Sequence, residues 1–346
     1  MTEVALERVD ELRVRLGALP RVKLAHLPTP LTACPRLYEA TGARVSIKRD
    51  DCTGLAFGGN KVRQLEFVLG DAIASGADCL IQGSASQSNH SRQLAAAGAR
   101  LGLDVFLLPK QDERSTPVQG NQLVSHLLGA TILPIGASES STERKRQLAD
   151  SLRAHGRTPY VVGMGEDRAL ALAALAYVEA LLEIVEASND TPPDVIVTTS
   201  QGSTQAGLQL GCHLLNLPTK VIGINPMPPD HEAYISPAGI ADLTRSAGAL
   251  LGLPCTLTET DIVNSTEYVG QGYGIPTTAG LAAIKLLAST EGILLDPVYS
   301  GKGFAGLLDH HRTHATSPDA RLVFVHTGGL PAIFSYASDL INDEQG

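Results

Sequence analysis

The 346-residue chain contains no tryptophan, and aromatic residues make up only 4% of it. Its cores must therefore be packed mainly with aliphatic side chains. No apolar stretch is long enough for a membrane span: the most apolar helical segment, 169–178, is interrupted by Glu179, well short of about 20 residues. The N-terminus carries early acidic residues and lacks the apolar core of a signal peptide. We therefore expect a cytoplasmic protein that does not bind membranes.

Basic residues and paired cysteines are also scarce. The formal net charge of -9 argues against a nucleic-acid partner, which requires a basic surface. The five cysteines are scattered singly, without C-x-x-C spacing, which favours reduced thiols over disulfides or zinc. We expect no metal site, and Cys52 is predicted to be a small buried filler.

The length allows two domains, and strand and helix patterns alternate along most of the chain. Predicted strands cover 44–49, 79–81, 105–108, 131–133, 160–162, 195–197, 220–224 and 322–325. Predicted helices cover 4–16, 121–128, 143–155, 169–187, 203–215, 236–251, 278–290 and 303–314, and others begin near 60 and 89. This alternation predicts an α/β protein with mostly parallel sheets covered by helices.

A glycine-rich turn leads into a helix in the stretch 57–67. Gly58 and Gly59 allow a tight turn, and Asn60 can cap the helix that follows. Apolar residues then recur at helical spacing, which puts Lys61 in the first turn, where a helix has free amide groups. Taken alone, this lysine is predicted to be an ordinary solvated cation, because exposed lysines are common at such positions.

Three later stretches, 86–93, 200–207 and 296–302, combine small polar residues with predicted helix starts. In the first, Ser88 can cap a helix. The second follows a β-branched strand, and main-chain amides at the helix start there favour an anion such as phosphate. Ser203 and Thr204 add hydroxyl donors. Such a turn is equally an ordinary connection between a strand and a helix.

In this order, the four stretches resemble the pyridoxal-phosphate enzymes of the tryptophan-synthase-β type, known as fold type II. The most similar branch holds D-cysteine desulfhydrase and 1-aminocyclopropane-1-carboxylate deaminase, and the resemblance covers about residues 27–329. It implies pyridoxal 5'-phosphate in a cleft between two domains. The smaller domain would be 53–163, and the larger would be discontinuous, 1–52 and 164–346. The resemblance also implies a homodimer.

The resemblance assigns roles residue by residue. Lys61 would hold the cofactor as a Schiff base. The other implied cofactor-binding residues are Asn60, Asn89, Ser200, Gln201, Gly202, Ser203, Thr204 and Ser300. The implied substrate-binding residues are Ser88, Asn89, His90, Tyr273 and Tyr299. Of these, Ser88, Tyr273 and Tyr299 would join Lys61 in catalysis. For His90 a structural role is expected rather than a catalytic one. Thr327 would close the pocket floor near the ring, and no residue is assigned to the ring face.

Ser300 decides the predicted activity. Relatives with cyclopropane deaminase activity carry a glutamate after the tyrosine, and desulfhydrases carry a threonine. A carboxylate keeps the pyridine nitrogen protonated, whereas a hydroxyl leaves it neutral and the ring a weaker electron sink. Serine therefore favours β-elimination over opening a cyclopropane.

The implied reaction begins when the substrate frees the amine of Lys61, which removes the α-proton before the β-substituent leaves. The expected substrate is a small β-substituted amino acid, and the expected enzyme is D-cysteine desulfhydrase, a lyase giving pyruvate, ammonia and sulfide. The alternatives are an L-cysteate sulfo-lyase, the cyclopropane deaminase and a non-catalytic binding protein of the same fold. The turn 163–168 departs from the pattern of the branch, and Met164, Glu166 or Arg168 could alter substrate choice.

Overall fold

The computed structural model describes residues 3–112, 114–162, 167–189, 191–313, 317 and 319–341. Its strands are β1 (Leu31–Ala33), β2 (Val45–Lys48), β3 (Cys79–Ala85), β4 (Asp104–Lys110), β5 (Thr131–Ile132), β6 (Pro159–Val161), β7 (Val195–Thr199), β8 (Lys220–Ile224), β9 (Val263–Ser265) and β10 (Leu322–Val325). Its α-helices are α1 (Glu3–Gly17), α2 (Pro35–Thr41), α3 (Asn60–Ala74), α4 (Asn89–Leu101), α5 (Gly120–Leu127), α6 (Ser141–Ala154), α7 (Asp167–Ala187), α8 (Ser203–Leu214), α9 (Pro237–Leu250), α10 (Thr278–Glu291), α11 (Ser300–Thr313) and α12 (Ala337–Ile341). Short 3₁₀ segments are η1 (Asp50–Cys52), η2 (Leu55–Phe57), η3 (Glu259–Asp261) and η4 (Leu330–Tyr336).

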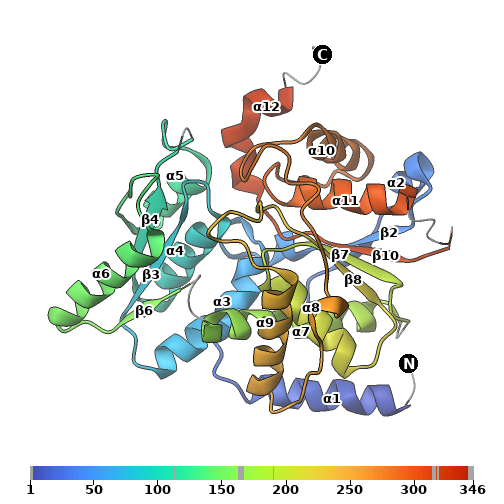
Figure 1. Cartoon of the computed structure of the whole chain (residues 1–346), viewed down its shortest axis with the longest axis horizontal. Helices are drawn as coiled ribbons and strands as arrows, with labels where there is room; N and C mark the ends of the chain where they lie inside the picture. Colours follow the sequence, from blue (N-terminus) through green and yellow to red (C-terminus); the bar gives the residue numbers. More distant parts are fainter. Residues whose placement is uncertain are drawn as a thin grey trace.

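Two sheets form the framework (Figure 1). The larger sheet has the strand order β1-β2-β10-β7-β8-β9, and the smaller has the order β5-β4-β3-β6. Neighbouring strands run parallel in both sheets, except that β1 is antiparallel to β2. The predicted α/β architecture with mostly parallel, helix-covered sheets is confirmed.

Helices cover both faces of the larger sheet. On β7, Ile196 belongs to the buried cluster that includes side chains of α7 and α8, whereas Val195 and Val197 pack with those of α10 and α11. Successive side chains of a strand point to opposite faces. Apolar residues on both faces are the reason that this strand appears in the sequence as an unbroken apolar run.

Helix α7 connects the two halves of the molecule. It packs against α3 on one side and against α8 and α9 on the other (Figure 1). The approach of α8 is so close that a Cβ at Gly207 would lie 1.9 Å from the carbonyl oxygen of Ala174. Glycine at this position and alanines along α7 therefore permit the contact. As a result α3, whose first turn carries Lys61, is held against the helices of the larger sheet.

The two sheets take their strands from different stretches of the chain. All strands of the smaller sheet lie within residues 79–161. The larger sheet takes β1 and β2 from the chain before this segment and its remaining strands from the chain after it. The division into 53–163 and a discontinuous domain of 1–52 and 164–346 stays a prediction.

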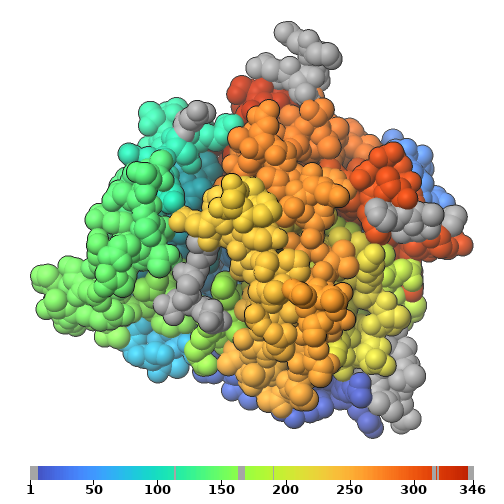
Figure 2. Space-filling view, in the orientation of Figure 1, coloured from blue at the N-terminus to red at the C-terminus, as the bar shows by residue number. Residues whose placement is uncertain are grey.

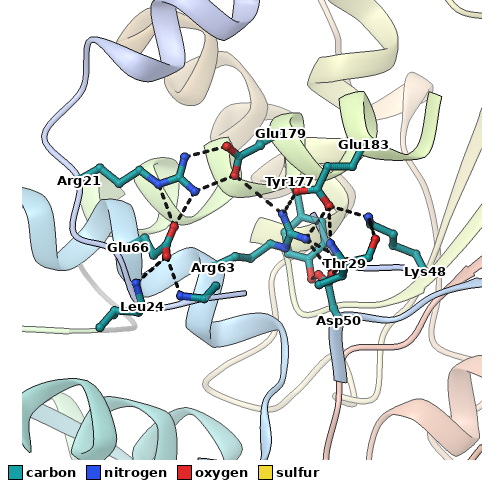
Figure 3. A network of polar contacts seen from close by, with 11 residues as sticks. Arg21, Leu24, Thr29, Lys48, Asp50, Arg63, Glu66, Tyr177, Glu179 and Glu183 are labelled. Atoms are coloured by element: carbon teal, nitrogen blue, oxygen red, sulfur yellow. Dashed lines mark hydrogen bonds and ion pairs between the residues drawn. The ribbon is translucent and has the colours of Figure 1, made fainter. Parts of the chain in front are cut away.

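A buried network of charged side chains links α3 to α7 and β2 (Figure 3). Arg63, on α3, places Nη2 2.9 Å from Asp50 Oδ1 and 3.0 Å from Glu183 Oε2. Lys48 Nζ lies 2.5 Å from the same Glu183 oxygen, and the Tyr177 hydroxyl donates to Asp50 Oδ2 over 2.6 Å. Burial disfavours the charged carboxylates, but Arg63 and Lys48 outweigh it and hold the pKa values of Asp50 and Glu183 below their ordinary range. Both acids are therefore ionised inside the protein.

The sequence missed several short elements and misplaced one cap. Helix α2 and strands β1 and β9 were not predicted, because each is short and α2 has a single buried residue, Leu37. The residue that precedes α3 is Gly59, not Asn60, and it has a φ of +125°. Asn60 instead begins the helix, and its side-chain Nδ2 donates to Thr204 Oγ1 over 3.3 Å. The predicted cap at Ser88 is confirmed, since its hydroxyl accepts from the amide of Ser91.

All five cysteines are free thiols. Cys52 is exposed, so the prediction of a buried filler was wrong. Its partial burial and the Asp51 carboxylate nevertheless raise the pKa of its thiol. Across the described ranges, no helix has the length and apolarity that crossing a bilayer requires, and no group of His, Cys, Asp and Glu residues could hold a metal ion.

Candidate active site

A cavity of about 360 Å³ lies beyond the carboxyl ends of β3, β4 and β7. Ligands of open α/β sheets commonly bind beyond this edge. Figure 2 shows the surface hollowed between the teal and green part of the chain and the yellow part. The cavity brings together every predicted site residue except Ser300: Asn60, Lys61, Ser88, Asn89, His90, Ser200, Gln201, Gly202, Ser203, Thr204, Tyr273 and Tyr299.

Lys61 presents an amine to this cavity. It lies half-buried in the first turn of α3, and its amine makes no hydrogen bond or ion pair with any described residue. Burial lowers its pKa to about 8. The neutral form, which is the form that attacks an aldehyde, is therefore far more populated near physiological pH than in an ordinary lysine, although the ammonium still predominates below about pH 8. The sequence-based view of Lys61 as an ordinary solvated cation does not hold in the folded chain.

We expect the rate at which the cofactor-free protein captures pyridoxal phosphate to rise with pH and to level off above about pH 8. The reason is that the pKa of Lys61 is lowered from 10.5 to about 8, so the neutral amine is already abundant there. The measurement is the absorbance change on mixing, followed from about pH 6.5 to about pH 9.5. A rate that keeps rising in proportion to hydroxide up to the ordinary lysine pKa would contradict this expectation.

The segment before Lys61 is strained and is held by one buried arginine. Five residues of the segment 54–59 have positive φ, including the non-glycine residues Ala56 and Phe57. The guanidinium of Arg92 donates to the carbonyl oxygens of Ala56 and Gly58, and also to Asn89 Oδ1 over 3.3 Å. Strained backbone of this kind persists only where surrounding contacts fix it. Arg92 thus ties the loop that positions Lys61 to the start of α4.

The start of α4 presents free donors to the cavity. Asn89 Oδ1 accepts from Asn121 Nδ2 over 2.9 Å as well as from Arg92. The Nδ2 donor of Asn89 has no partner among the described residues, so it can donate to a ligand. His90 is half-buried, and burial, reinforced by the charges of Lys61 and Lys145, lowers its pKa to about 3. This imidazole is therefore neutral at physiological pH.

The start of α8 forms an anion cup. The main-chain amides of Ser203 and Thr204 make no hydrogen bond with described residues, and the two hydroxyls accept from Gln64 Nε2 over 3.1 and 3.4 Å. Free amides at a helix start favour a phosphate group. Gly202 has a φ of +154°, and a Cβ there would lie 2.9 Å from Ile235 Cδ1. Glycine is therefore required for the shape of the cup.

Two tyrosines line the cavity as a hydrogen-bonded pair. The hydroxyl oxygens of Tyr273 and Tyr299 are 2.9 Å apart, and the rings meet edge to face. Burial raises the pKa of Tyr273 to about 12 and the pKa of Tyr299 well above its ordinary value. Both phenols therefore remain protonated and can donate a hydrogen bond or a proton at physiological pH.

Ser300 lies outside the lining. It is fully buried, and its hydroxyl donates to Asp296 Oδ1 over 2.5 Å. Two residues close to Ser300 do line the cavity. One is its chain neighbour Tyr299, and the other is Thr327. The residue after Thr327, Gly328, has its carbonyl oxygen 3.5 Å from Ser300 Oγ. The role of Ser300 beside a cofactor ring stays a prediction.

Several residues that line the cavity were not predicted from the sequence to belong to the site. Gln64 lies one helical turn after Lys61 and shares its face, which is a signal that was available. Lys110 and Glu232 line the cavity and form an ion pair of 2.7 Å, but they are 122 residues apart in the chain, and no local pattern connects them. Residues 163–166 of the divergent turn, including Met164 and Glu166, lie outside the described residues. Arg168 binds the carboxylate of Asp71 over 2.7 Å and does not line the cavity.

The groups around the cavity fit pyridoxal phosphate. The amine of Lys61, with its lowered pKa, suits the aldehyde of this cofactor, the free amides of α8 suit its phosphate, and the unpartnered donor of Asn89 suits its phenolic oxygen. The fold and this site define an α/β enzyme with a cofactor aldehyde. A sequence model of the family described as "Pyridoxal-phosphate dependent enzyme" matches residues 22–328. The chain belongs to this family of pyridoxal-phosphate dependent enzymes.

Individual proteins similar to this chain include enzymes of one branch of the family. The chain is 40% identical to the D-cysteine desulfhydrases of Salmonella typhi and Salmonella newport over 327 residues, which cover 93% of this chain and 97% of each relative. A crystal structure of a homologue of ACC deaminase superposes with a TM-score of 0.85 at 33% identity and covers 96% of this chain and 99% of its own. A mutant O-ureido-L-serine synthase superposes with a TM-score of 0.61 at 16% identity, over 94% of both chains, and shares the fold.

Proposed function

We propose that this protein is a D-cysteine desulfhydrase, which converts D-cysteine and water into pyruvate, hydrogen sulfide and ammonia. The observation that carries the proposal is the 40% identity to D-cysteine desulfhydrases over nearly the full length of both chains. It is supported by the unpartnered amine of Lys61, which faces the same cavity as the anion cup.

Lys61 would hold the cofactor and, once released, move the α-proton of the substrate. The amides and hydroxyls of Ser203 and Thr204, with the turn 200–202, would bind the phosphate, and Asn60 would support them through Thr204. Asn89 would donate to the phenolic oxygen. When bound, pyridoxal phosphate supplies an electron-withdrawing ring that takes up the charge left on the α-carbon.

The substrate would lie between the start of α4 and the tyrosine pair. Ser88 accepts the amide of Ser91, so its own hydroxyl hydrogen is available to the substrate carboxylate. The neutral His90 would contribute shape and polarity rather than charge. Tyr299, kept protonated by burial and supported by Tyr273, would donate to the leaving group or to the α-carboxylate.

Replacing Tyr299 by phenylalanine is expected to lower kcat about 100-fold, since it removes a positioned proton donor from the reaction. Replacing Tyr273 by phenylalanine is expected to lower kcat only about 10-fold, because that hydroxyl acts through the hydrogen bond to Tyr299. Steady-state kinetics with D-cysteine measure both effects. Equal losses in the two variants would contradict the assignment of Tyr299 as the proton donor and of Tyr273 as its support.

The experiment that tests the proposed function is a substrate screen on the cofactor-loaded protein. Release of ammonia and of the 2-oxo acid is measured with D-cysteine, L-cysteine, D-serine, L-serine, β-chloro-D-alanine, L-cysteate and 1-aminocyclopropane-1-carboxylate, and sulfide is measured as well with the two cysteines. Highest kcat/KM for D-cysteine supports the proposal. Preference for L-cysteate or for the cyclopropane would replace it by one of the two alternative lyases, and no turnover of any compound would favour a binding protein. The homodimer and the cytoplasmic location stay predictions.

A further inference from the structure

Lys302, in the first turn of α11, is a buried lysine that has no part in the proposed mechanism. Its side chain is fully buried and makes no ion pair with any residue that the structure describes. The ammonium donates instead to the main-chain carbonyl oxygens of Val269, over 2.7 Å, and of Gly272, over 3.2 Å. Burial lowers the pKa of this amine to about 8, although the charge of Asp296 acts in the opposite direction. Burying an ammonium without a carboxylate partner costs stability, so these contacts indicate a role other than stabilising the fold.

Both carbonyl oxygens belong to the segment that carries Tyr273. This segment, residues 266–277, connects β9 to α10 and contains neither helix nor strand. Gly270 and Gly274 within it have φ values of +69° and +77°. Glycines at such positions give the unfolded segment much conformational freedom. The place of the Tyr273 side chain therefore depends on contacts from outside the segment.

Two side chains hold the main chain on either side of Tyr273. Lys302 binds the carbonyl oxygen of Gly272, the residue before it. The hydroxyl of Tyr336, which belongs to η4 and is buried, donates over 2.8 Å to the carbonyl oxygen of Gly274, the residue after it. The backbone is thus fixed immediately before and immediately after the tyrosine that lines the cavity.

Lys302 is also part of the structure that carries the second tyrosine, Tyr299. It lies three residues later, where α11 begins, and the amide of Gly303 donates to the Tyr299 carbonyl oxygen over 3.0 Å. One ammonium therefore joins the start of α11 to the segment of Tyr273. We infer that Lys302 and Tyr336 are positioning residues that hold the hydroxyl of Tyr273 against that of Tyr299, 2.9 Å away. The inference rests on the proposed function, which gives the tyrosine pair its part in proton transfer.

The test is a double-mutant cycle of Lys302→Met and Tyr273→Phe. Methionine keeps most of the length of the lysine and removes its charge. The value compared is kcat on whichever compound of the substrate screen has the highest kcat/KM. Each single variant is expected to lower kcat about 10-fold, and the double variant also about 10-fold, because Lys302 acts through the hydroxyl that Tyr273→Phe removes. A lysine that only stabilised the fold would give independent losses, about 100-fold in the double variant.

Tyr336→Phe tests the second contact by removing a single hydroxyl. It is expected to lower kcat about 3-fold alone and not at all in the Tyr273→Phe background. Tyr268→Phe is the matched control, because its hydroxyl joins the same segment to Asp309 of α11 over 2.8 Å without flanking Tyr273. This control should change kcat by less than about 2-fold. All variants should keep a full equivalent of cofactor that borohydride can fix.

Three results would overturn the inference: an unchanged kcat in Lys302→Met, independent losses in the double variant, or a control as impaired as Tyr336→Phe. If Lys302→Met does not fold, Tyr336→Phe and its combination with Tyr273→Phe decide. A best substrate other than D-cysteine would overturn the proposed function alone, since the cycle is then measured on that compound. Turnover of none of the compounds would overturn both.

Discussion

Replacing Lys61 by alanine is expected to abolish the covalently held cofactor and to lower kcat by at least about 1000-fold. Lys61 is the unpartnered amine of the cavity, and it would both hold the aldehyde and move the α-proton. The cofactor would then be held only through its phosphate and phenolic contacts. Borohydride reduction followed by peptide mapping measures the covalent fraction, and pyruvate formation measures turnover.

Lys110→Ala is the matched control for this substitution. Lys110 also lines the cavity, but its ammonium is paired with Glu232 at 2.7 Å. This variant should retain a full equivalent of reducible cofactor on Lys61. Covalent cofactor in the Lys61→Ala protein, mapped to another lysine, would contradict the assignment.

The second large effect is expected on stability, from Arg63→Ala. This side chain is fully buried and contacts both Asp50 and Glu183, which are ionised (Figure 3). Removing one partner of a buried ion pair leaves uncompensated charge and costs about 3–5 kcal/mol. We therefore expect a large fall in the denaturant midpoint, measured by circular dichroism.

Arg13→Ala provides the comparison for a surface pair. Arg13 lies 2.8 Å from Glu186, but both side chains are about half exposed or more, at 48% and 67%. Pairs of this kind contribute about 0–1 kcal/mol. A loss in Arg63→Ala no greater than that in Arg13→Ala would show that the buried network does not stabilise the fold. Because Arg63 lies two residues after Lys61, the same variant should also weaken cofactor retention.

Much of the site was accessible from sequence because its residues lie in local patterns. A glycine turn before a helix, a serine cap and a hydroxyl-rich turn after a strand each describe a few consecutive residues. The tertiary fold brings the lining members of these patterns to one cavity, as the motif order implied. Asn60 was wrongly predicted to be the cap of α3. Both glycine and asparagine are common at that position, and the sequence does not show that the chain takes a positive φ at Gly59 and begins the helix at Asn60.

The sequence by itself determined the alternation of apolar strands and amphipathic helices, and with it the mostly parallel, helix-covered sheets, since side-chain periodicity is a local property. Only the tertiary structure decided the chemical state of the site. Burial gives Lys61 its lowered pKa and keeps the tyrosines protonated, and packing pairs Lys110 with Glu232 across 122 residues. The hydrogen-bond direction of Ser300 is also set by the fold. Its hydroxyl donates to Asp296, four residues earlier, because the start of α11 brings the two side chains together. Charge, burial and hydrogen-bond direction depend on what surrounds a residue in space, and the chain order does not specify those surroundings.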